Sequence, residues 1–174
     1  MDLDVLKLDL DRFEEGLTSL SFDVDDSFFE AVGADEVHRG QVHVDLDIVR
    51  ANDDVFTLKF RGSGTVTLPC VVCLDDMEQP IEFEEQICAK LGGENSEDDD
   101  LVTVAEDEGI LDVSWYVYEF IDLAIPIRHV HAPGKCNPAM IRALSEHSAV
   151  RSGEDSEGEV DPRWAALSKL KFKN

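Results

Sequence analysis

Hydrophobic and polar residues alternate along three stretches in the first half of the chain. Over residues 41–48, apolar side chains occupy every second position, and residues 56–68 and 81–91 repeat the pattern. A period of two is typical of a strand with one buried and one exposed face. With a hairpin turn over residues 51–54, the three stretches predict an antiparallel β-meander. Gly62 and Gly64 fall on the apolar face, which indicates a bend, a bulge or a close backbone approach.

Three other segments have the signals of short helices. Asp25 or Asp26 can cap a helix that ends at Gly33. Residues 115–125 are apolar nearly all round, which predicts a helix buried against the sheet. A third helix is predicted to begin at Asn137, followed by a proline at its first position. Its apolar residues are expected to face inward: Met140, Ile141 and Leu144.

The fold class that these elements define is α+β, with an antiparallel β-meander or partial barrel packed with a few short helices. Residues 1–151 are predicted to form a single domain. Within it, residues 92–109 are acidic and turn-rich and predict a mobile surface loop with one short extended piece. Residues 152–161 read as an acidic linker, and residues 162–174 as an amphipathic basic segment.

The charge balance is strongly acidic and narrows the choice of partner. Fifteen Lys and Arg residues face 39 Asp and Glu, for a formal net charge of −24. Such a chain repels phosphate, so direct nucleic-acid binding is disfavoured. The charge favours a basic partner, such as a ribosomal protein, or serves solubility alone. With no apolar run of about 18–20 residues and no signal peptide at Met1–Lys7, we expect a cytoplasmic protein with no membrane contact.

The clearest candidate chemistry is a pair of cysteines, Cys70 and Cys73. Two thiolates at this spacing can chelate one metal ion, because a tight turn aims both sulfurs at one point. A structural zinc ion needs about two further ligands. The candidates are Cys136 and His131, with His129 as the alternative to His131. The prediction is therefore either no cofactor or one structural zinc ion.

Two other interpretations of the cysteine pair remain open. The cysteines can simply be buried, or they can be redox-active. A redox pair usually lies at a helix N-terminus, whereas the residues flanking Cys70 and Cys73 have a strand pattern, which argues against redox activity. The remaining cysteine, Cys88, falls on the polar register of its strand and is not expected to be a ligand.

Motifs of catalysis are missing from the sequence. It has no nucleophile elbow, phosphate-binding glycine loop or zinc-protease helix motif, so we expect a protein that is not an enzyme. The basic terminal segment either docks on the body of the protein or contacts a partner. The candidate partner-binding residues are Arg163, Trp164, Lys169 and Lys171.

Several motifs, in this order and spacing, resemble the YceD family over nearly the whole chain. They are a Cys-x-x-Cys-Leu knuckle at 70–74, an apolar helix ending in Ile-Pro with a nearby His at 125–129, Gly-Lys-Cys-Asn at 134–137, and Asp-Pro-Arg-Trp at 161–164. The resemblance implies a non-enzymatic factor in the synthesis, processing or stability of large-subunit ribosomal RNA, with a ribosomal protein or ribosomal precursor as partner. Family members often carry a second cysteine pair where this chain has only Cys136.

Overall fold

The computed structural model describes residues 3–51, 55–94, 96–98 and 101–147. The chain divides into two compact units, residues 1–141 and 142–174, and the fold below is that of the first. Its elements, in chain order, are η1 Leu3–Leu6, β1 Lys7–Asp9, η2 Leu10–Arg12, β2 Gly16–Val24, α1 Asp26–Val32, β3 Arg39–Ala51, β4 Val55–Pro69, β5 Asp76–Gly92, β6 Ser96–Asp98, β7 Leu101–Ala105, β8 Ile110–Asp112 and α2 Ser114–Leu123. The last helix, α3 Pro138–His147, spans the boundary between the units.

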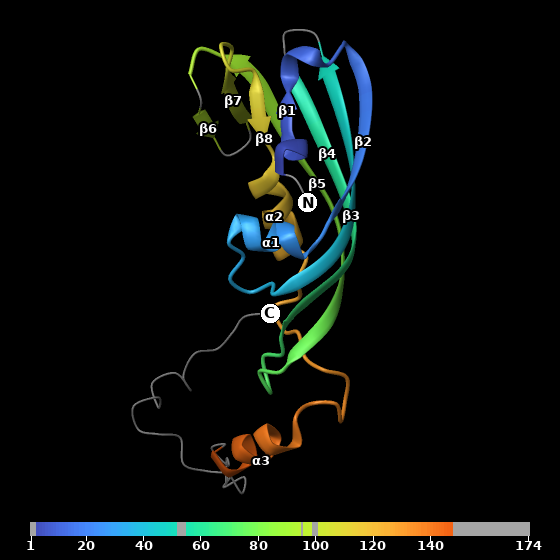
Figure 1. Ribbon diagram of the computed structural model, residues 1–174, viewed down its shortest axis with the longest axis vertical. Coiled ribbons are helices and arrows are strands. Elements are labelled where there is room, and N and C mark those ends of the chain that lie inside the picture. Colours follow the sequence, from blue (N-terminus) through green and yellow to red (C-terminus); the bar gives the residue numbers. More distant parts are fainter. Residues whose placement is uncertain (1–2, 52–54, 95, 99–100, 148–174) are drawn as a thin grey trace, which may run out of the picture. The chain divides into compact units, whose positions relative to one another are not determined.

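The main sheet has six strands in the order β2-β3-β4-β5-β7-β6. β3, β4 and β5 form the predicted antiparallel meander. β2 adds a fourth antiparallel strand that was not among the three predicted stretches, and the four strands curve around α1 and α2 (Figure 1). The α+β fold class is therefore confirmed. β7 pairs with β5 in parallel, and β1 and β8 form a separate two-stranded sheet. No helix among the described residues is long and apolar enough to span a membrane.

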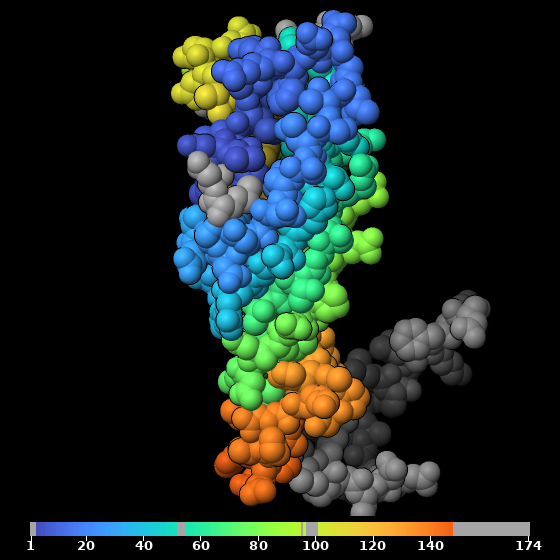
Figure 2. All heavy atoms as spheres, turned by 45° about the vertical axis from the view of Figure 1, so that its right-hand side comes forward, coloured from blue at the N-terminus to red at the C-terminus, as the bar shows by residue number. Residues whose placement is uncertain are grey.

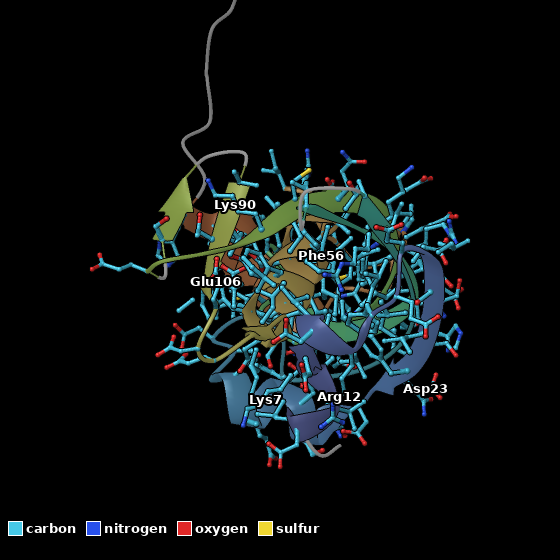
Figure 3. The ribbon with its side chains drawn as sticks, turned by 90° about the horizontal axis from the view of Figure 1, so that it is seen from above. Lys7, Arg12, Asp23, Phe56, Lys90 and Glu106 are labelled. Carbon is cyan, nitrogen blue, oxygen red and sulfur yellow. The ribbon has the colours of Figure 1, made fainter. Side chains whose placement is uncertain are left out.

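The hydrophobic core lies on the concave face of the meander, as the period-two pattern predicts. Phe56, Leu58 and Phe60 of β4 are fully buried. In Figure 3, Phe56 points into the interior that the strands enclose, whereas Asp23 lies on the outside. α2 closes this interior, because the Phe120 ring packs 5.4 Å from the ring of Phe60. The predicted helix at 115–125 is thus buried against the sheet, although its first residue, Trp115, is 58% exposed.

Both glycines on the apolar face of β4 mark close approaches, which confirms that prediction. A Cβ atom on Gly62 would lie 2.2 Å from the ring of Phe83 on β5. A Cβ atom on Gly64 would lie 2.2 Å from the backbone oxygen of Gln41 on β3. The missing side chains let the neighbouring strand and ring come close.

The helix boundaries follow the predicted caps. Asp25 is the N-cap of α1, and its carboxylate accepts the backbone N–H of Ser27 at 3.0 Å. Gly33 ends that helix in the left-handed conformation, with φ of 72°. Asn137 caps α3 by accepting the backbone N–H of Ala139 at 3.0 Å.

The inward face predicted for α3 is wrong. None of its residues is buried, and Ile141 and Leu144 are 41% and 46% exposed. A spacing of three or four residues puts apolar side chains on one side of a helix, but it does not supply a surface that covers them.

The acidic segment 92–109 contains more ordered backbone than a loop. The extended piece expected there is β7, which pairs with β5, and β6 pairs with β7 in turn. This segment therefore extends the main sheet. The predicted linker 152–161 and the basic segment 162–174 lie outside the described residues.

Candidate metal centre

A tight turn joins β4 to β5, and we call residues 70–75 the cysteine knuckle. The backbone N–H of Cys70 donates to the Asp75 carbonyl at 2.9 Å, and that of Leu74 donates to the Cys70 carbonyl at 2.9 Å. Leu74 has a φ of 64°, in the left-handed region that non-glycine residues rarely adopt. The Val72 N–H points at the Cys70 sulfur, 3.5 Å away. The knuckle thus turns sharply around a buried sulfur atom.

A second segment, residues 126–137, follows α2 and lies against the knuckle; we call it the return segment. In Figure 2 its orange atoms meet the green atoms around the β4–β5 turn. The Val71 N–H donates to the His129 carbonyl at 3.1 Å, and the Asn137 amide donates to the Asp75 carboxylate at 3.1 Å. These contacts bring together parts of the chain more than 50 residues apart.

Four side chains converge where the knuckle and the return segment meet. One ligand atom from each of Cys70, Cys73, His131 and Cys136 lies within 4.8 Å of all the others. The Sγ atoms of Cys70 and Cys136 are 3.9 Å apart, and Cys73 Sγ is 3.3 Å from His131 Nδ1. Cys70 and Cys73 are buried, while the other two residues are partly buried. We call these residues the S₃N cluster.

The structure brings together the four residues that the sequence analysis put first. The alternative ligand, His129, is not in the cluster, since its Nδ1 lies 3.0 Å from the Pro126 carbonyl. Cys88 is also outside it, on β5 opposite Thr57. The candidate partner-binding residues Arg163, Trp164, Lys169 and Lys171 lie outside the described residues.

A backbone carbonyl orients His131, and no sequence signal marks it. His131 Nε2 lies 3.3 Å from the Asp76 carbonyl. Because a carbonyl accepts, Nε2 carries the proton and Nδ1 turns its lone pair toward the sulfurs.

The sulfurs have unequal affinities for a proton. Burial acts to raise the pKa of Cys70, but hydrogen bonds from the backbone of Cys73, His131 and Val72 lower the pKa to about 5. Burial and the neighbouring Cys70 and Cys73 sulfurs raise the pKa of Cys136 to about 11. The Cys70 thiol therefore loses its proton more readily than the Cys136 thiol.

The fold and the cluster define a class of protein: an α+β protein whose β-meander carries a cysteine and histidine cluster at the β4–β5 turn. The chain belongs to the YceD family. The profile of that family, described as "Large ribosomal RNA subunit accumulation protein YceD", matches residues 58–171. The match contains most of β4 and all four residues of the S₃N cluster.

The chain is also similar in sequence to a bacterial protein whose name gives no activity. The "Uncharacterized protein YlbN" of Bacillus subtilis (strain 168) is 32% identical over 111 residues, which are 64% of this chain and 63% of that protein. The similarity thus spans less than two thirds of the relative's length. No solved structure matches the chain. The family description names an accumulation role and no reaction.

Proposed function

We propose that the protein is a non-catalytic accessory factor in the synthesis, processing or stability of large-subunit ribosomal RNA. The observation that carries this proposal is membership of the YceD family, whose description names large ribosomal RNA accumulation. The family match includes most of β4, together with β5, α2 and the S₃N cluster, and it begins after β3.

Electrostatics support a protein as the direct partner in this role. The net charge is −24, and several basic side chains of the described part are already engaged by aspartates. Arg61 lies 2.8 Å from Asp47, and Arg12 lies 2.7 Å from Asp9. Such pairs remove positive charge that phosphate groups would need. A basic ribosomal protein, alone or within a ribosomal precursor, is the complementary partner.

The test of the function is genetic. Deleting the gene is expected to lower the ratio of large-subunit to small-subunit ribosomal RNA, and the full-length gene is expected to restore it. An unchanged ratio would contradict the proposal.

The test of the partner is biochemical. Gradient sedimentation of a lysate is expected to place the protein with a large-subunit precursor, and the association is expected to weaken as salt is added. Ribonuclease treatment separates two kinds of contact, since a protein contact survives it and a direct RNA contact does not. A pull-down with this protein that recovers other proteins but no ribosomal protein or ribosomal RNA would favour an interaction domain with no ribosomal role.

A further inference from the structure

We propose that the S₃N cluster is a closed structural zinc site, with Cys70, Cys73, Cys136 and His131 Nδ1 as its four ligands. This inference is independent of the ribosomal role, because it rests on the geometry of the four side chains. Four observations support it: the distances between the ligands, the completeness of the ligand set, the surroundings of the ligands and the sparse apolar packing at this end of the fold.

Two distances between ligand atoms are close to the edges of a zinc tetrahedron, and all four ligand atoms lie within 4.8 Å of one another. Bonds of about 2.3 Å to sulfur and about 2.0–2.1 Å to nitrogen place two sulfurs about 3.8 Å apart, and a sulfur and a nitrogen about 3.6 Å apart. The observed separations are 3.9 Å for Cys70 and Cys136, and 3.3 Å for Cys73 and His131. A disulfide would need about 2.05 Å between the sulfurs, so the cysteines are spaced for an ion between them.

The ligand set is complete, which decides the kind of site. Structural zinc sites use four protein ligands drawn from Cys and His, whereas catalytic sites use three and keep one position for water. The cluster supplies three thiols and one imidazole, so no position is left for a substrate. Soft sulfur ligands also favour zinc over magnesium, calcium or manganese.

The groups around the ligands have the arrangement that zinc sites require. A ligating histidine usually donates its other N–H to a carbonyl, and the Asp76 carbonyl lies 3.3 Å from His131 Nε2. A thiolate ligand is usually stabilised by backbone N–H groups, and the Val72 N–H lies 3.5 Å from the Cys70 sulfur. These contacts fix the direction of one imidazole and one thiolate without using the lone pairs that face the centre.

A bound zinc ion would also hold the return segment to the knuckle, where apolar packing is sparse. Val71, Leu74 and Ile127 are 47%, 67% and 100% exposed, so apolar packing does little to hold the return segment to the knuckle. The cluster links residues 58 and 66 positions apart in the chain. A bound ion replaces the hydrophobic core that is missing there, as metals do in small domains.

Elemental analysis of the full-length protein tests the proposal. The protein, purified without chelators, is expected to contain one zinc ion per chain, and Cys88→Ser is the matched control that keeps it. Cys136→Ser and His131→Ala are expected to lose most of the zinc, whereas His129→Ala and His131→Cys are expected to retain it. Circular dichroism establishes that each variant keeps its sheet. A zinc-free protein that gains none from added zinc overturns the proposal.

Cobalt substitution and thiol counting provide a test that needs no variant. Cobalt added to the metal-free protein is expected to give the visible absorption of a tetrahedral thiolate site, and zinc is expected to displace it. Zinc is also expected to protect three of the four thiols from alkylation and to leave Cys88 reactive. A disulfide between Cys70 and Cys136 in the freshly purified protein, or equal reactivity of all thiols with and without zinc, would overturn the proposal.

Discussion

The centre of the β-meander and the knuckle end of the same domain are held together in different ways. At the centre, β3, β4 and β5 bury a continuous apolar face under α2, with Leu46, Leu58 and Phe60 fully buried. At the knuckle end, the apolar residues Leu74 and Ile127 are exposed, and three cysteines and one histidine converge. Many weak contacts stabilise the first region, so each residue contributes a part. In the second region, the four ligands of the proposed zinc site converge instead.

The largest expected effect is a loss of packing at the centre. Phe60→Ala removes a fully buried ring that lies 5.4 Å from Phe120, and should lower the free energy of unfolding by about 3–5 kcal/mol. Urea denaturation followed by circular dichroism measures the loss. Leu17→Ala is the control, because Leu17 is 66% exposed and its removal should change little. Equal losses in the two variants would show that the concave face is not the core.

The knuckle end should detach without unfolding the centre. Given the proposed zinc site, a chelator removes a ligand that contributes about 2.7 kcal/mol when free zinc is 100 times its dissociation constant. The Val71 amide, which donates to the His129 carbonyl, is expected to lose protection in hydrogen exchange. The Leu58 amide, at the centre of the meander, is expected to keep its protection. In Cys73→Ser the chelator should have no effect, and an equal effect there would argue against the cluster as its target.

A smaller loss of stability is expected from adding a methyl group at Gly62, where the packing at the centre is tight. Gly62→Ala places a Cβ atom 2.2 Å from the Phe83 ring, and such overpacking costs about 1–3 kcal/mol. This exceeds the gain of about 0.4–1 kcal/mol that a Gly-to-Ala change can bring through the unfolded chain. Thermal unfolding measures the difference. Gly93→Ala is the control, since nothing lies within 4 Å of its Cβ position. Gly62→Ala combined with Phe83→Leu should recover part of the loss.

The smallest expected effect on stability comes from the titration of His43, on the outer face of the sheet. Hydrogen bonding to Asp23 and the charges of Asp23 and Asp45 raise the pKa of His43 above its usual value, although desolvation opposes this. A raised pKa in the folded state means that the interaction stabilises fully below the unfolded pKa of about 6.5 and is lost as the pH rises through the folded pKa. NMR titration should show a lower His43 pKa in Asp23→Asn. An unchanged pKa would assign the shift to other charges.

The same contrast explains what the sequence could predict. The alternation of residues 41–48 and 56–68 predicts β3 and β4, because the period of two records which face is buried. The four residues of the cluster could be proposed from the sequence, because zinc ligands are drawn from few residue types and the chain has few cysteines and histidines. The inward face of α3 was wrong, since its apolar stripe at Ile141 and Leu144 carries no information about a covering surface.

Other features leave no trace in the side chains. The parallel pairing of β7 with β5 depends on the path of the chain after Gly92, which periodicity does not describe. The carbonyl of Asp76 orients His131, yet every residue has a carbonyl. The choice between His131 and His129 therefore needed three-dimensional geometry, in which His129 turns to the Pro126 carbonyl.

The long separation between the two halves of the S₃N cluster also orders the events of folding. β2 to β5 pair with their neighbours in the chain, so each hairpin can form soon after its second strand has been synthesised. The cluster forms only after its later residues have been synthesised. His131 follows Cys73 by 58 positions, and Cys136 follows Cys70 by 66 positions. During that interval the two early thiols are exposed to oxidants and competing metals. The meander is therefore expected to form first, and the knuckle end to complete the domain.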